Sequence, residues 1–209
     1  MAQIRFEDGI RVGSDLKIES GTTVTGFLRS FINQTALAEY VIPMTSWRVW
    51  DAGDTNLPDP SVTDAIGLIF GVWATNSPTL QTRDLKTLST SLFARTTIAL
   101  PPEYDPAETI RLRFHAGAKT TISDGSLTLD VVCYKSDDEE GISSDLCAQV
   151  PLTINSLTMA DKDFEITATS LNPGDVLDVR IEVACVDSST SSSVLGRIGK
   201  SSLVCDIRG

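Results

Sequence analysis

His115 is the only histidine in the chain and therefore the first residue to consider for acid–base chemistry. It follows Phe114 in the segment TIRLRFHA (109–116), in which apolar residues occupy every second position. That alternation places His115 on the solvent side of a strand, and no Ser or Cys nucleophile motif lies beside it. A surface or interface histidine is therefore expected, no catalytic residue is predicted, and the chain is predicted not to be an enzyme.

Acidic side chains gather in two segments that could attract a hard cation such as calcium. SDDEEG (136–141) has four carboxylates in a row, and Asp51, Asp54, Asp59 and Asp64 are spread along a loop. Neither segment has the spaced oxygen ligands and central glycine of an EF-hand loop. We expect a solvated hairpin tip and a surface loop, and we predict no metal and no cofactor. Cation binding by an acidic loop stays open.

The four cysteines contain no CxxC pair, and one histidine is too few for the usual zinc sites. Cys133, Cys185 and Cys205 each continue an apolar row of period two, so they are expected on the buried faces of strands. All four cysteines, Cys147 included, are predicted to be free thiols rather than disulfides.

Two of the three tryptophans lie in SWRVWDAG (46–53), and the third is Trp73. An exposed Trp beside Asp and Asn would suit a sugar-binding patch. A Trp buried in a sandwich core is the commoner case. The sequence leaves both interpretations open.

Length, charge and hydropathy limit the class of protein. The 209 residues suffice for one main core with an appendage, and the net charge of -11 argues against nucleic-acid binding. No run of about 18 apolar residues occurs, and MAQIRFEDG lacks the regions of a secretory signal. The sequence therefore predicts a protein made in a cytoplasm, with no membrane span.

The second half of the chain alternates apolar and polar residues in several short segments separated by turn residues. SLTLDVVCY (126–134) and VLDVRIEVAC (176–185) show the pattern most clearly, with Asp130, Asp178 and Arg180 on the polar side. FEITATS (164–170) and SLVCDI (202–207) extend it, whereas residues 51–65 have the composition of a surface loop. This pattern predicts an antiparallel, jelly-roll-like β-sandwich over residues 40–209.

The N-terminus contains a six-residue repeat, IRFEDG (4–9), IRVGSD (10–15) and LKIESG (16–21), with a degenerate copy at 22–27. Each unit predicts a three-residue strand and a turn, which buries too little surface to fold alone. Residues 1–27 are therefore predicted to form a stalk or docking arm, and 28–39 a linker or short helix. Ordinary hairpins at the edge of the main domain are the alternative. The repeat aligns two apolar rows and one basic row, predicted to contact another subunit or a protein shell: Ile4, Ile10, Leu16; Phe6, Val12, Ile18; Arg5, Arg11, Lys17.

This short β-repeat stalk followed by a jelly-roll-like body resembles the trimeric capsid decoration, or cement, proteins of tailed bacteriophages, and more loosely phage fibre proteins. IRFEDG-IRVGSD-LKIESG and the strand entry LNPGDVLDVRIEVA (171–184) carry the resemblance. It implies a homotrimer that binds the major capsid protein or another virion protein, on the outer surface of a virion assembled in the host cytoplasm. Three good repeats are too few for a long fibre, which favours a short peg.

The alternative function belongs to a different class. The Trp-bearing loops would serve a receptor- or carbohydrate-binding module of a tail fibre or adhesin.

Overall fold

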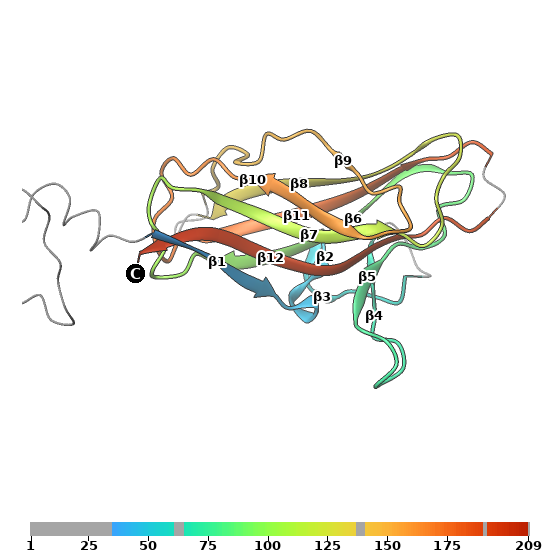
Figure 1. Ribbon diagram of the computed structural model, residues 1–209, viewed down its shortest axis with the longest axis horizontal. Coiled ribbons are helices and arrows are strands. Elements are labelled where there is room, and N and C mark those ends of the chain that lie inside the picture. The colour runs from blue at the N-terminus through green and yellow to red at the C-terminus, as the bar shows by residue number, and fades with distance from the viewer. Residues whose placement is uncertain (1–34, 61–64, 137–140, 190–191, 209) are drawn as a thin grey trace, which may run out of the picture. The chain divides into compact units, whose positions relative to one another are not determined.

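The computed structural model describes residues 35–60, 65–136, 141–189 and 192–208, which form two antiparallel β-sheets. The sheets face one another as the layers of a β-sandwich, and no α-helix occurs among the described residues (Figure 1). Within the same ranges, no helix has the length and apolar character to cross a membrane. The predicted fold class, an all-β antiparallel sandwich, is confirmed for this part of the chain. The predicted stalk lies outside it.

Each sheet has six strands. Sheet A has the order β10-β7-β12-β5-β4, and β1 also pairs with β12. Its strands are β1 (Thr35–Ile42), β4 (Gly67–Ile69), β5 (Thr79–Gln81), β7 (Ile110–Ala118), β10 (Ala160–Glu165) and β12 (Gly196–Arg208). Sheet B has the order β3-β2-β6-β11-β8-β9. Its strands are β2 (Arg48–Val49), β3 (Ala52–Asn56), β6 (Ser89–Ala99), β8 (Ser126–Ser136), β9 (Leu152–Thr153) and β11 (Val176–Val186). The 3₁₀ turn η1 (Met44–Ser46) lies between β1 and β2.

Strand β11 lies inside sheet B and pairs along its length with β6 on one side and β8 on the other. Because side chains alternate along a strand, one row of β11 points between the sheets. That row is buried and consists of Leu177, Val179, Ile181, Val183 and Cys185. The inward row predicted for this segment is confirmed.

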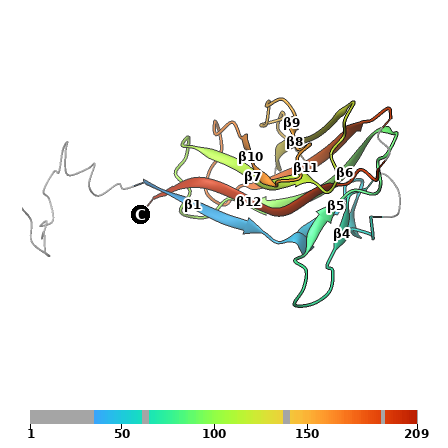
Figure 2. The same cartoon turned by 45° about the vertical axis from the view of Figure 1, so that its right-hand side comes forward.

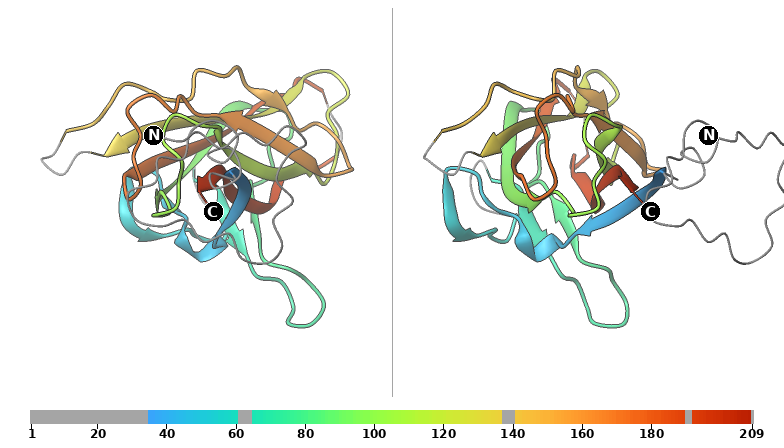
Figure 3. Two further views of the ribbon diagram at one scale, coloured as in Figure 1. Left: turned by 60° about the vertical axis from the view of Figure 1, so that its left-hand side comes forward. Right: turned by 90° about the vertical axis from the view of Figure 1, so that its left-hand side faces the viewer.

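Figure 3 shows the two layers of the sandwich from their ends. Aromatic rings fill part of the space between these layers. The rings of Phe114 on β7 and Phe164 on β10 meet edge to face, with centroids 6.0 Å apart. Trp47 lies 6.1 Å from Phe114 on the other side, and all three side chains are buried. These rings fix how β10 and the η1 segment pack against the core.

The predicted strand FEITATS (164–170) was placed too late in the chain. The strand is β10, Ala160–Glu165, and its outward row is acidic because it pairs with the basic row of β7. Charged outward residues hid the start of the strand in the sequence. Beyond Glu165, Ile166 N still donates to Ile110 O of β7 at 3.0 Å, and Thr167 N then donates to Leu146 O at 2.8 Å.

Strand structure extends into two segments that the sequence predicted to be a linker and a loop. β1 begins at Thr35 inside the predicted linker 28–39, and β3 lies inside the predicted loop 51–65. Among the described residues, β1 pairs with β12 only and β3 with β2 only. A strand at a sheet edge buries few side chains, so its apolar period is weak.

Candidate functional site

A cavity of about 310 Å³ opens on the outer face of sheet B. Three strands of this sheet position most of its lining, because alternation turns every second side chain of β6, β8 and β11 away from the core. Two further residues come from the turn after β2, and one follows the acidic segment after β8. The lining residues are Trp50, Asp51, Arg95, Tyr134, Ile142, Asp178 and Arg180.

An arginine and two aromatic rings form the stacked side of this cavity. The guanidinium of Arg180 lies 5.1 Å from the ring centroid of Phe93 and 5.8 Å from that of Trp50. The two rings are themselves in contact, with centroids 5.3 Å apart. Cation–π attraction and ring packing together hold the three side chains in one arrangement. Of these three side chains, Trp50 and Arg180 line the cavity, so the cluster contributes an indole and a guanidinium to its wall.

A bidentate ion pair forms the next part of the wall. Arg95 Nε donates to Asp178 Oδ1 at 2.7 Å, and Arg95 Nη2 donates to Asp178 Oδ2. The hydrogen bond to Asp178 raises the pKa of Arg95. Asp178 was predicted on the outward side of its strand, either exposed or paired at an interface. It does lie on the outer face, but it is buried, because the Arg95 side chain pairs with it there.

Two N–H donors in the cluster have no acceptor. Trp50 Nε1 and Arg180 Nε are shielded from solvent and have no hydrogen-bond partner. A third such atom, Arg111 Nε on sheet A, lies 3.3 Å from the carboxylate of Asp163. A buried donor without an acceptor costs about 1–3 kcal/mol. Both atoms lie beneath the cavity surface, so Trp50 or Arg180 would have to move before a ligand oxygen could accept from them.

On the outer face of sheet A, by contrast, strands β7 and β10 carry paired charges. Arg113 on β7 donates two hydrogen bonds of 2.7 Å to Asp163 on β10. This pairing holds the pKa of Asp163 below its usual range and raises that of Arg113. His115 Nδ1 lies 2.8 Å from Asp161 Oδ1, on the solvent side of β7 where the alternation predicted it. The geometry gives His115 a place in an ionic row between two strands.

The other residues considered from the sequence are dispersed. The nine contact residues from Ile4 to Ile18, the acidic tip 137–140 and Asp64 lie outside the described residues. Asp51, Asp54 and Asp59 are exposed, and no group of three or more His, Cys, Asp or Glu side chains in the described ranges could hold a metal. All four cysteines are buried free thiols.

The three tryptophans have three different environments. Trp47 is buried in the core, and Trp50 is half-buried in the sheet B cavity. Trp73 is 94% exposed at the tip of the β4–β5 hairpin, which projects from the sandwich (Figure 2). Hydrogen bonds between Val72 and Asn76 close this turn, with Asn76 N donating to Val72 O at 2.9 Å and Val72 N donating to Asn76 Oδ1 at 3.2 Å.

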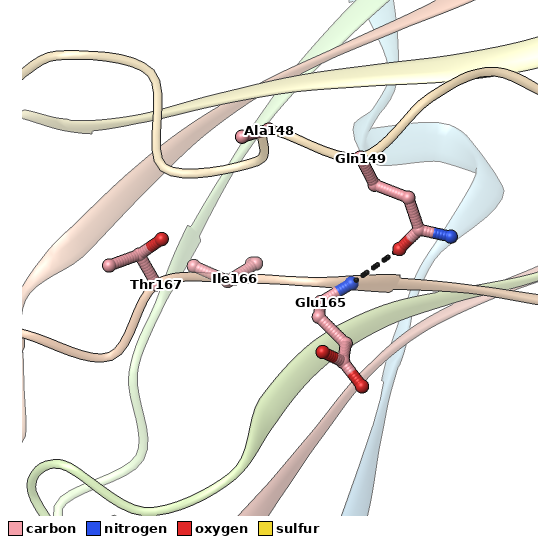
Figure 4. Close-up of a pocket in the computed structure, with 5 residues that line it drawn as sticks. All are labelled: Ala148, Gln149, Glu165, Ile166 and Thr167. Atoms are coloured by element: carbon pink, nitrogen blue, oxygen red, sulfur yellow. Dashed lines mark hydrogen bonds between the residues drawn. The ribbon is translucent and has the colours of Figure 1, made fainter.

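A second cavity, of about 500 Å³, lies beside β10. Its lining is Ala148, Gln149, Glu165, Ile166 and Thr167 (Figure 4). The Gln149 amide accepts a hydrogen bond from Glu165 N at 3.1 Å and donates one to Asp163 O at 3.1 Å. No aromatic side chain lines this cavity, and the one polar side chain that spans it is already bonded to the strand. It is a weaker candidate for a ligand site than the cavity on sheet B.

The sequence did not single out Arg95, Tyr134, Asp178 or Arg180 as binding residues. Each of these residues lies at an outward position of a long strand, where a polar residue is ordinary, so the sequence pattern did not mark them. Only the register of β6, β11 and β8 shows that these positions fall in one place.

No protein-family model matches the chain, and no curated protein matches its sequence. Solved structures similar to it include the xylan-binding module CBM15, which is 12% identical with a TM-score of 0.43 and covers 82% of this chain and 97% of that one. The CBM22-1 xylan-binding domain from Paenibacillus barcinonensis Xyn10C is 8% identical, with a TM-score of 0.37, and covers 69% of this chain and 82% of that one. A structure of infectious bursal disease virus is 15% identical, with a TM-score of 0.32, and covers 74% of this chain and 39% of that one. Identities and TM-scores this low transfer no ligand or partner to this chain.

Proposed function

We propose that this protein is a non-catalytic binding module and that the cavity on the outer face of sheet B binds a carbohydrate. The observation that carries the proposal is the pairing of Trp50 and Arg180 in the cavity lining, where an indole supported by Phe93 lies beside a guanidinium. A sugar ring has apolar C–H faces and a rim of hydroxyl oxygens. The first suits packing against the indole, and the second suits hydrogen bonding to the polar side chains of the lining.

The remaining lining supports the same ligand class. Tyr134 adds a phenol that can donate or accept, and the Arg95–Asp178 pair offers a planar array of fixed polar atoms. Arg95, Arg180, Asp51 and Asp178 bring two positive and two negative charges to the lining, which favours a neutral saccharide over a strongly charged one. Both oxygens of Asp178 accept hydrogen bonds from Arg95. The cavity wall therefore does not offer two unpaired carboxylates of the kind that a glycosidase uses.

The test is affinity electrophoresis of the full chain in gels containing soluble polysaccharides, xylan and a β-glucan among them, followed by calorimetry on any polymer that slows migration. Trp50→Ala and Arg180→Gln should each weaken binding about tenfold or more, equivalent to about 1.4 kcal/mol. Trp73→Ala is the matched control, because it removes an exposed indole outside this cavity. Thermal melting should show all three variants folded.

Two results would refute the proposal. One is a folded wild-type protein that binds no saccharide in the panel. The other is binding that Trp73→Ala abolishes while Trp50→Ala leaves it intact, because the ligand would then sit on the hairpin.

A second candidate function is a homotrimeric decoration protein that attaches to a virion shell. The observation favouring it is the six-residue repeat, whose apolar and basic rows recur at fixed spacing in residues 4–18. Such a protein would stabilise the shell by binding only its assembled form. Deleting residues 1–26, or changing Arg5, Arg11 and Lys17 together to Glu, should then abolish attachment while the sandwich stays folded. Particles that bind the altered protein as well as the intact one would exclude this function.

A further inference from the structure

The edges of the two sheets differ in how well they are protected from further pairing. An edge strand exposes unpaired backbone N–H and C=O groups, and proteins commonly block such edges with charges, side-chain caps or short strands. In the described part of the chain, β3, β4 and β9 are short, with five, three and two residues. The longer edge strands are β10 and β1, with six and eight residues.

Strand β10 is closed by its neighbours. The side-chain amide of Gln149 accepts a hydrogen bond from the Glu165 amide, which Figure 4 shows, and donates one to the Asp163 carbonyl. It thus replaces a ladder partner along the outer edge of the strand. The sequence ADKDFE also carries four charged side chains in six residues. A second strand approaching β10 would have to displace the amide and desolvate these charges.

Among the residues that the structure describes, nothing gives strand β1 either kind of protection. Its sequence, TALAEYVI, contains one charged residue, Glu39, and that charge is already compensated, because Lys200 Nζ lies 2.6 Å from Glu39 Oε1. Ser202 Oγ donates to the same oxygen at 2.7 Å, and these hydrogen bonds hold the pKa of Glu39 below its usual range. Within the described ranges, β1 forms a ladder with β12 alone, along its whole length.

Apolar side chains extend from this edge toward the β4–β5 hairpin. On the outer face of β1, Leu37 is 55% exposed and Val41 is 60% exposed. Val41 and the exposed Phe70 line a common cavity of about 280 Å³. Residues 65–82, which form the hairpin, contain no charged side chain. Leu37, Val41 and Phe70 thus make the β1 edge surface, an exposed apolar area of the kind that marks protein contacts.

We propose that β1 pairs edge to edge with β1 of a second copy of this chain, joining two copies of sheet A into one continuous antiparallel sheet. The outer rows of the two strands would then lie on the same face, with Leu37 and Val41 of one copy beside those of the other. Apolar rows are self-complementary, as a two-fold interface requires. Two chains of net charge -11 repel, so they should meet where charge is scarce. The β1 edge surface has no charged side chain, and the one carboxylate of β1, Glu39, is compensated by Lys200.

Sedimentation of the full chain over a range of concentrations measures this association. At high concentration the wild-type protein should sediment as an assembly with an even number of chains. Val41→Lys should weaken this association about tenfold or more, because it forces an unpaired cation into the contact. Val150→Lys is the matched control, because Val150 is equally apolar, is 73% exposed and lies outside β1. It should associate like the wild type.

Cross-linking tests the strand pairing itself. Single cysteines placed at each of positions 36 to 41 in turn should form an intermolecular disulfide most readily at one position, near the two-fold axis, and less readily on either side of it. The native cysteines are buried and should not interfere. The proposal is overturned if the wild-type protein is monomeric at its highest soluble concentration, if Val41→Lys leaves the assembly unchanged, or if no position cross-links.

Discussion

The indole nitrogen of Trp47 donates a hydrogen bond to the hydroxyl of Ser201, 3.1 Å away and 154 residues later in the chain. Ser201 Oγ in turn donates to the carbonyl of Ile42 at 3.1 Å. Trp47 and Ser201 are both fully buried, so one hydroxyl satisfies a donor and an acceptor that water cannot reach. This relay joins the segment after β1 to β12.

Ser201→Ala should lower the free energy of unfolding by about 1–3 kcal/mol, because it leaves the Trp47 N–H without its acceptor in the core and removes one donor from the Ile42 carbonyl. Urea denaturation measures the change. Ser126→Ala, at an exposed position of β8, is the control and should stay within about 0.5 kcal/mol of the wild type. Equal stability of the two variants would show that the buried relay contributes nothing.

Asp163→Asn should change how stability depends on acidity. Hydrogen bonds from Arg113 lower the pKa of Asp163 in the folded protein, whereas the pKa of an Asp in the unfolded chain is about 3.9. The resulting stabilisation is fully present above the unfolded pKa and is lost as pH falls through the lower folded pKa. The variant should therefore be less stable than the wild type at neutral pH, with a difference that shrinks below about pH 4. Glu165→Gln, on the same strand but without an ion pair among the described residues, is the control; a difference that stays constant from pH 7 to the acid limb would contradict the mechanism.

The long inner strands could be predicted because burial on one face forces an alternation that survives in the sequence. Leu177 to Cys185 is such a case, and the positions of the row were correct. Edge strands could not be predicted as well. β1 and β3 bury little, and β10 exposes a charged row, so all three lack the apolar period that identifies a strand.

The candidate site could not be predicted from the sequence for a different reason. Arg95 and Asp178 are 83 residues apart, and nothing local to either one indicates that they meet. Their contact depends on the register of β6 against β11, which places Arg180 directly across from Arg95. The tryptophans made a sugar patch one open interpretation, but only the structure separates buried Trp47, cavity-lining Trp50 and exposed Trp73.

The native thiols should be unreactive. Burial raises the pKa of Cys147, Cys185 and Cys205 to about 11 and that of Cys133 still further, so little thiolate exists at pH 8. An aromatic disulfide reagent should detect almost no thiol in the folded protein and four in denaturant without reductant. A count of two or fewer in denaturant would reveal a disulfide, for which Cys133 and Cys147 are the nearest pair in sequence.

Val179→Asp should unfold the sandwich or cost more than about 4 kcal/mol, because Val179 is fully buried and an unpaired carboxylate would replace it. Val150→Asp makes the same chemical change at a 73% exposed position and should cost less than about 0.5 kcal/mol. Chemical denaturation compares the two. Similar losses for both variants would show that the inward register of β11 is wrong.

Gln149→Ala should expose the edge of β10. The substitution removes the acceptor of the Glu165 amide and the donor to the Asp163 carbonyl, at a cost of about 0.5–1.5 kcal/mol for each bond. Water can reach an edge strand and replace both partners, so the loss in the free energy of unfolding should lie toward the lower end of that range for each bond. An unblocked edge also favours pairing between chains, and the variant should aggregate faster than the wild type on mild heating. Gln149→Glu separates the two effects, because a carboxylate can still accept from Glu165 but cannot donate to Asp163, and its added charge should keep chains apart. Light scattering that rises equally for both variants would mean that the amide does not protect this edge.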